Sequence, residues 1–233
     1  MLYMRVVILQ PSYIPWRGYF QQIQMADLFV FYDCVQYDKH GWRNRNKIKT
    51  PQGSQWLTIP VSSKGCVSNG LQIKDATILW DANWAEKHMK SICQNYRKAP
   101  FFHDYMPLVE SIYERRDQKL ADFTCATTEV IARTLGIDHT KFLRSSTLPT
   151  AGSKTDRLIG ILKNLGATQY FSGPSANTYL EKKKLDEIGV STEFIAYDYP
   201  EYPQINGPFE PQVTILDLLF NVGPNAGKYI WNQ

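Results

Sequence analysis

Short apolar runs alternate with helical periodicity in the first part of the chain. Residues 6–9 form an apolar run rich in β-branched side chains that stops at Gln10 and Pro11, which predicts a buried strand ended by proline. Aromatic and aliphatic residues then recur at helical spacing over 15–25, and 28–32 repeats the buried-strand pattern. Because a strand, a helix and a strand in this order usually form a right-handed βαβ unit, the opening predicts an α/β fold.

Hairpin and helix patterns follow in the middle of the chain. Residues 42–48 and 56–61 flank the sequence Thr-Pro-Gln-Gly at 50–53, which favours chain reversal and predicts a β-hairpin. Asp81 is a suitable N-cap for the first of the expected helices. These helices are expected over residues 82–96, about 103–115 and 119–135.

The last third of the chain returns to α/β alternation. We expect helices over 156–165, 179–188 and 214–221 and strands over 168–171 and 192–197, with Thr214 as the cap of the last helix. The whole pattern predicts one α/β domain over residues 1–233, with a Rossmann-like, mostly parallel sheet flanked by helices. A helical middle segment at about 81–136 and a β-hairpin complete this predicted fold.

Composition narrows the class of protein. The 233 residues are 43% hydrophobic and 21% charged, which is typical of a globular chain and not of a disordered one. The net charge of +4 is spread over the sequence, which favours a small anionic substrate over nucleic acid. No apolar run approaches the roughly 18 residues of a membrane span, and residues 1–9 lack a basic leader.

Cysteine usage points to a reducing compartment. The cysteines form no CxxC pair, so neither a metal site nor a disulfide framework is predicted, and we expect a cytoplasmic protein with reduced thiols. The sequence carries no signal for an oligomeric state. The four cysteines are Cys34, Cys66, Cys93 and Cys125.

The loop from Gln10 to Tyr19 is the first candidate site. It connects the first predicted strand to a helix, and open α/β sheets bind ligands in crevices at the carboxyl ends of their strands. Two prolines and a glycine would hold the loop rigid, so that Gln10, Tyr13, Arg17 and backbone N–H groups meet an anion. The loop has neither a GxGxxG pattern nor a Walker lysine, and a tightly packed turn would have a similar composition.

A polar segment after the second predicted strand is the second candidate site. Asp33 lies just past that strand, and His40 has an ordinary pKa near neutrality, so His40 is a candidate general base that Asp33 or Asp38 could orient. A histidine beside glycine in a loop is also typical of a plain polar surface. The catalytic candidates are therefore His40 and Asp33.

Arginine and asparagine alternate at the end of this segment. In extended geometry the arginines share one face and the asparagines the other. Guanidinium groups suit phosphate or carboxylate, and asparagine amides suit amide or sugar groups. A solvated hairpin face would look the same from composition. The substrate-binding candidates here are Gln36, Trp42, Arg43, Asn44, Arg45 and Asn46.

A third candidate segment runs from Ser172 to Tyr179, between a predicted strand and a predicted helix. Its small hydroxyl residues and glycine allow close approach of a ligand, so Ser172, Ser175 and Asn177 form a possible second phosphate cradle. A capped strand-to-helix turn is the alternative interpretation. Elsewhere, His88 shares an aromatic helix face, which is typical of a histidine at the edge of the core.

Five blocks of sequence resemble the WbqC-like protein family. They are QPSYIPWRGYF, FYDCVQYDKHGWRNRNKI, WLTIPV, GATQYFSGPSANTYL and FEPQVTILDLLFNVGP, and the likeness runs from Val6 to about Ala226. The D-x-V-Q and N-R-N combinations are its most specific parts. Genes of this family often lie in bacterial surface-polysaccharide clusters, so the resemblance implies O-antigen biosynthesis and transfer of glycine onto an amino sugar. It assigns no catalytic residues.

The leading functional hypothesis is an acyl or aminoacyl transferase, including glycyl transfer, acting on an amino sugar or sugar nucleotide. His40 or Asp33 would take a proton from the sugar amine. Arg43 and Arg45 would hold a phosphorylated donor or acceptor, and an asparagine amide would stabilise the oxyanion. The candidate co-substrates are ATP and an activated acyl donor.

Two other hypotheses stay open. A nucleotidyltransferase or ATP-dependent amide ligase would use the first loop together with the serine-rich segment. The H-x-G-H motif of nucleotidyltransferases is absent, because Trp16-Arg17-Gly18-Tyr19 stands in the comparable place. The third hypothesis is a non-catalytic sugar-nucleotide binding module.

Overall fold

A parallel β-sheet forms the centre of the fold. The computed structural model describes residues 3–62, 70–149, 152, 154–174 and 180–231. The sheet order within these residues is β5-β2-β1-β6-β7, and every neighbouring pair is parallel. The predicted α/β, Rossmann-like class is therefore confirmed. The strands are β1 (Arg5–Leu9), β2 (Leu28–Phe31), β5 (Lys141–Arg144), β6 (Gln169–Ser172) and β7 (Ser191–Phe194).

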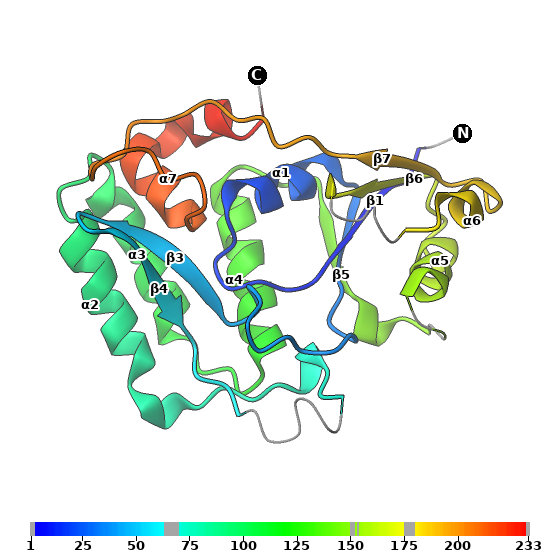
Figure 1. Cartoon of the computed structure of the whole chain (residues 1–233), viewed down its shortest axis with the longest axis horizontal. Helices are drawn as coiled ribbons and strands as arrows, with labels where there is room; N and C mark the ends of the chain where they lie inside the picture. Colours follow the sequence, from blue (N-terminus) through cyan, green and yellow to red (C-terminus); the bar gives the residue numbers. More distant parts are fainter. Residues whose placement is uncertain (1–2, 63–69, 150–151, 153, 175–179, 232–233) are drawn as a thin grey trace.

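Both faces of the sheet are covered because the central strands are apolar on both sides. Val7 of β1 packs into a large core cluster with side chains of α1 (Arg17–Met25) and α4 (Leu120–Thr134). Val6 and Ile8 point to the other face, where α5 (Lys154–Asn164) and α6 (Lys182–Asp186) cover them. Figure 1 shows these two helix layers on either side of the strands.

The strand order reverses at β1. The chain passes from β1 to β2 and β5 on one side, and β6 and β7 lie on the other side. In open α/β sheets such a reversal leaves a crevice outside the carboxyl ends of the two strands that flank it. The crevice is expected here beyond Leu9 of β1 and Ser172 of β6.

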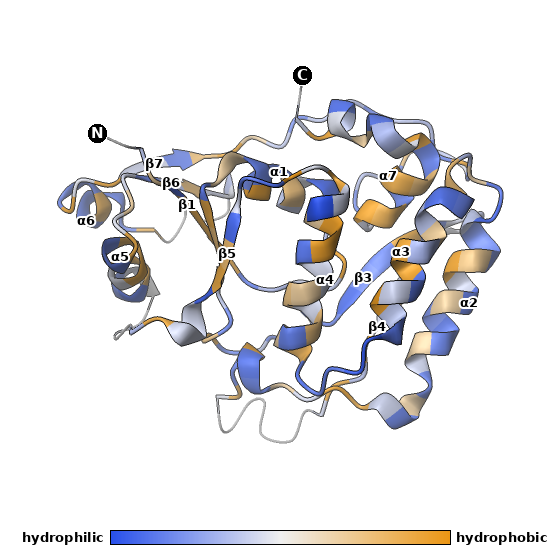
Figure 2. Cartoon of the chain, turned by 180° about the vertical axis from the view of Figure 1, so that it is seen from behind, coloured by the Kyte–Doolittle hydropathy of each residue, from blue (hydrophilic) through white to orange (hydrophobic). Residues whose placement is uncertain are grey.

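A hairpin and helices are inserted between β2 and β5. The predicted hairpin is confirmed as β3 (Arg45–Thr50) paired with β4 (Gly53–Thr58), with Pro51 and Gln52 at its turn. Its apolar side joins the large core cluster, and Figure 2 shows hydrophobic colour along the central strands and on α7. The neighbouring helices are α2 (Trp84–Tyr96), α3 (Phe102–Glu114) and α7 (Ile215–Val222). Short 3-10 helices are η1 (Ile73–Asp75), η2 (Trp80–Ala82), η3 (Ser145–Thr147) and η5 (Gly223–Tyr229).

Three local features show how the expectations compare with the structure. Asp81 is not the N-cap of α2, because it lies in η2 and Asn83, with a left-handed φ of 48°, occupies the cap position. The strand β5 was not predicted. The predicted cap Thr214 is confirmed, since its side chain accepts a hydrogen bond from the backbone N–H of Leu216 at 3.4 Å. Among the helices that the structure describes, none combines the length and apolar content that a membrane crossing requires.

Candidate functional site

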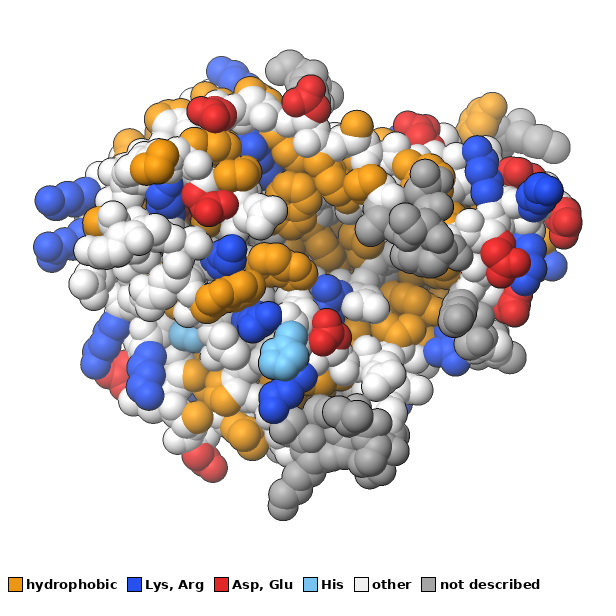
Figure 3. Space-filling model, viewed as in Figure 1, with side chains coloured by type: hydrophobic (Ala, Val, Ile, Leu, Met, Phe, Trp, Pro, Cys, Tyr) orange, Lys and Arg blue, Asp and Glu red, His pale blue; other side chains and the backbone are white. Residues whose placement is uncertain are grey.

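A cavity of about 1250 Å³ lies at the carboxyl ends of β1 and β6, where the strand order reverses. In the face viewed in Figure 3 a hollow is floored largely by hydrophobic side chains, with Lys or Arg side chains at its edge. Segments far apart in sequence form the cavity wall. The wall includes Gln10, Ser12, Trp16, Trp42, Arg43 and Ser172.

Asn46 fastens the first loop to the hairpin arm. Its Nδ2 donates to the carbonyl oxygens of Tyr13 at 3.1 Å and Ile14 at 2.7 Å. Ile14 has a φ of 37°, a left-handed conformation that a β-branched residue adopts only when its surroundings enforce it. The backbone N–H of Tyr13 also donates to the carbonyl of Trp42 at 3.0 Å. The loop and the arm therefore meet at one cavity.

Arg43 is a cation on the cavity wall that forms no ion pair with a described residue. It makes no hydrogen bond or ion pair with any residue in the described part of the chain, and its Nε is buried without a partner. Burial lowers the pKa of Arg43, and the nearby Tyr19 and Asp38 partly offset this effect. Since a guanidinium stays charged in a protein, an unpaired one in an apolar wall favours a phosphate or carboxylate ligand.

Arg45 and Arg17 lie outside the cavity wall. The Arg45 guanidinium stacks over the Trp56 ring at 4.4 Å and donates to the carbonyl of His40. Arg17 donates to the carbonyl oxygens of Pro200 at 2.8 Å and of a residue in η5 at 3.2 Å. The expectation that the two hairpin arginines act on one partner is corrected, because β3 begins only at Arg45 and the turn before it aims Arg43 separately.

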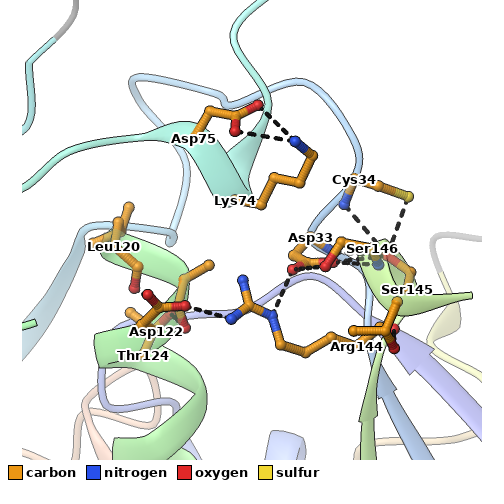
Figure 4. A network of polar contacts seen from close by, with 12 residues as sticks. Asp33, Cys34, Lys74, Asp75, Leu120, Asp122, Thr124, Arg144, Ser145 and Ser146 are labelled. Carbon is orange, nitrogen blue, oxygen red and sulfur yellow. Dashed lines mark hydrogen bonds and ion pairs between the residues drawn. The ribbon is translucent and has the colours of Figure 1, made fainter. Parts of the chain in front are cut away.

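Asp33 forms a structural clamp between β2 and β5. Its carboxylate, which is fully buried, accepts from Arg144 Nε at 2.7 Å and from Ser145 Oγ at 3.0 Å. It also accepts from Ser146 N at 2.9 Å and Oγ at 2.8 Å, and Arg144 pairs further with Asp122. Figure 4 shows this network. These four donors occupy the acceptor capacity of a carboxylate, and Asp33 does not line the cavity, so its placement differs from the expected acid/base role.

His40 and Gln36 are exposed and also lie outside the cavity wall. The backbone N–H of His40 donates to Asp38 Oδ1 at 3.0 Å. Gln36 forms an isolated antiparallel bridge with Gln72. No hydrogen bond joins His40 to Asp33 in the described residues, so the expected catalytic pair is not assembled in this structure.

Tyr13 and Asn44 form hydrogen bonds that hold the segments around the site in place. The Tyr13 hydroxyl, which is buried, bonds to His88 Nδ1 at 2.9 Å and to the Tyr113 hydroxyl. Asn44 Nδ2 donates to the Ile59 carbonyl at 2.7 Å, which secures the base of the hairpin. Tyr13 and Asn44 therefore do not line the cavity. The sequence candidates that do line it are Gln10, Trp42, Arg43, Asn46 and Ser172.

The third candidate segment reaches the wall through Ser172. Its Oγ accepts from the Tyr170 hydroxyl at 3.2 Å, and Thr155 lies buried nearby at the start of α5. Ser175 and Asn177 lie outside the described residues.

The wall also contains Gln22 on α1 and Tyr197 beyond β7, which the sequence patterns did not indicate. Gln22 Nε2 donates to the Tyr197 hydroxyl at 2.7 Å across a sequence separation of 175 residues. Trp16, at the start of α1, lines the wall beside them. No local pattern indicates such a pair, because each residue alone is typical of its element.

Comparison with known proteins places this architecture in a family. Residues 10–229 match the WbqC-like protein family. The uncharacterized protein Rv1507c of Mycobacterium tuberculosis strain H37Rv is 40% identical over 228 residues, which cover 97% of each chain. No solved structure matches the chain.

Proposed function

Because the chain belongs to the WbqC-like protein family, we propose that it is a transferase that acylates an amino sugar. The substrate is a sugar nucleotide held in the cavity, and the transferred group is an acyl or aminoacyl unit such as glycyl. The product serves bacterial surface-polysaccharide biosynthesis. The observation that carries the proposal is the unpaired Arg43 guanidinium in a largely apolar cavity at the reversal of the sheet.

The shape and lining of the cavity support a substrate with several chemical parts. Its volume of about 1250 Å³ exceeds the roughly 300–1,000 Å³ of a usual small-molecule site. Arg43 suits the phosphates, and the rings of Trp16 and Trp42 suit a base or a sugar face. Gln10 and Ser172 suit sugar hydroxyl groups. A sugar nucleotide combines all three kinds of group.

The proposed reaction needs one proton acceptor. The amine nitrogen attacks the acyl carbonyl, the bond to the donor's leaving group breaks, and the amine proton passes to a base. Glu181 is the carboxylate among the described wall residues, and it pairs with Lys184 at 3.2 Å. We assign the base role to Glu181 in place of the clamped Asp33, with His40, two residues before Trp42, as the second candidate.

Calorimetric titration with UDP-N-acetylglucosamine tests the binding site. Arg43→Gln should weaken binding by about 10- to 100-fold, because it removes a charge-assisted contact. Arg45→Gln is the matched control and should stay within about twofold of the wild type, since that guanidinium stacks on Trp56 outside the cavity. Equal losses in the two variants, or no loss in Arg43→Gln, would remove the basis of the proposal.

The strand order also supports a second candidate, an ATP-dependent nucleotidyl transfer or amide ligation. The order β5-β2-β1-β6-β7 is that of nucleotide-binding Rossmann sheets, in which a phosphate sits at the start of the first helix. In this chain the ring of Trp16 packs against Gly18 in the first turn of α1, the first helix. A rise in unfolding temperature with millimolar Mg-ATP, but not with UDP-sugars, would favour this candidate and count against acyl transfer to a sugar nucleotide. If UDP-sugars still stabilise a Glu181→Gln variant that has lost activity, the transferase assignment stands. The same result excludes a purely non-catalytic binding module.

A further inference from the structure

Two residues on the cavity wall keep a buried polar atom without a partner in the described part of the chain, Arg43 Nε and Gln22 Oε1. The proposed phosphate contact accounts for Arg43, and it leaves Gln22 unexplained. Gln22 is only 3% exposed, and burying an unpaired amide oxygen destabilises a protein. A ligand that donates a hydrogen bond would remove this penalty.

One end of the Gln22 amide contacts Tyr197. Gln22 Nε2 donates to the Tyr197 hydroxyl at 2.7 Å, and Oε1 is the buried amide atom without a partner among the described residues. The Tyr197 hydroxyl has no acceptor for its own proton among the described residues. It lies so close to Gly173 that a Cβ there would approach it to 2.9 Å, so the absence of a side chain at Gly173 makes room for it. The wall therefore presents an acceptor beside a donor.

Trp16 adds a flat apolar surface next to this pair. Its ring centroid lies 5.0 Å from that of Tyr197, edge to face. A Cβ at Gly18 would come within 2.4 Å of the indole, so glycine at this position lets the ring lie over the first turn of α1. Trp16, Gln22 and Tyr197 all line the cavity. An adjacent donor, acceptor and aromatic face suit a planar group that carries the complementary pair.

We infer that Trp16, Gln22 and Tyr197 form an amide subsite that recognises a planar N–H/C=O group of the substrate. The N–H donates to Gln22 Oε1, and the carbonyl accepts from the Tyr197 hydroxyl. This inference rests on the proposed function and specifies its substrate. The lactam edge of a uracil or thymine base carries the N–H and the C=O side by side and matches both contacts. The acetamido group of an N-acetylated sugar is a trans amide whose N–H and C=O point in opposite directions, so it reaches one of the two contacts at a time. Cytosine presents the reverse pattern, an acceptor nitrogen beside an amine donor.

Titration with four probes separates these sources: UDP, CDP, UDP-glucose and UDP-N-acetylglucosamine. If the base is read, the wild type prefers UDP to CDP. If the acetamido group is read, it prefers UDP-N-acetylglucosamine to UDP-glucose. Whichever of these two preferences the wild type shows should fall about tenfold in Gln22→Met and in Tyr197→Phe. Tyr199→Phe is the matched control and should keep it, because the Tyr199 hydroxyl donates to Gln21 outside the wall.

Thermal unfolding shows whether a loss of binding reflects a loss of fold. Gln22→Met removes the unpaired oxygen and should unfold at the same or a higher temperature while it binds less well. The inference is overturned if the wild type shows neither preference, if it prefers CDP to UDP, or if both variants keep the wild-type preference. Binding that depends on Arg43 and not on Gln22 or Tyr197 overturns the amide subsite alone. Absence of binding by every probe at millimolar concentration overturns the proposed function as well.

Discussion

His88 makes the stability of the fold depend on pH in a predictable direction. It lies in α2 with 6% exposure, and its Nδ1 bonds to the Tyr13 hydroxyl at 2.9 Å. Burial lowers the pKa of His88 to about 4, although a backbone hydrogen bond with Thr58 partly opposes this shift. A histidine buried in the neutral form must either stay unprotonated or unfold its surroundings as the solution becomes acidic.

The sign and size of the effect follow from the two pKa values. In the unfolded chain His88 has an ordinary pKa of about 6.5. Its contribution to stability is therefore fully present above pH ~6.5 and is lost as the pH falls toward the folded pKa of about 4. The total effect is about 3 kcal/mol, of which about 2 kcal/mol is lost by pH ~5.

Urea unfolding at pH 7.5 and at pH 5 measures this effect. His88→Gln does not titrate and keeps a polar partner for Tyr13, so its free energy of unfolding should fall by about 2 kcal/mol less than that of the wild type between the two pH values. His103→Gln, at an exposed position, should behave as the wild type does. Equal losses in the wild type and His88→Gln would refute the argument that the buried imidazole is neutral.

Three further substitutions test the scaffold of the site. Asp33→Ala should lower the free energy of unfolding by about 3 kcal/mol in urea titrations, because Arg144 loses a buried partner; an unchanged stability with lost activity would instead return Asp33 to a catalytic role. Gly18→Ala should lower the unfolding temperature and weaken UDP-sugar binding, since the new Cβ would meet the Trp16 ring at 2.4 Å and overpacking costs about 1–3 kcal/mol; unchanged binding would contradict the packed ring. Asn46→Ala should increase amide hydrogen exchange in the first loop, because two carbonyl contacts are lost, and unchanged exchange would show that other contacts hold the loop.

The framework of the fold was predictable because buried parallel strands appear as short apolar runs. The strand β1 and its neighbour β2 have this pattern, and each is followed or preceded by helical periodicity. The edge strand β5 was missed because its sequence, Lys-Phe-Leu-Arg, is charged at both ends and only partly buried. Its place in the sheet depends on pairing with β2 across more than a hundred residues, which no local pattern indicates.

The sequence indicated where the site lies better than it indicated which side chains line it. The first loop follows a predicted strand, so its place at the carboxyl end of the sheet followed from the topology, whereas its contact with the hairpin arm depends on Asn46. The direction of Arg43 depends on the turn before β3, where strand periodicity does not yet apply. The clamp on Asp33 comes from Arg144, 111 residues away, and therefore left no signal near Asp33 itself.

A crystal structure of the chain soaked with a UDP-sugar would locate the phosphates of the ligand. We expect phosphate oxygens within hydrogen-bond distance of the Arg43 guanidinium, with the ligand lying between β1 and β6. Density for the nucleotide over Arg45 and Trp56 on the outer face of the hairpin, with the cavity unoccupied, would contradict this expectation.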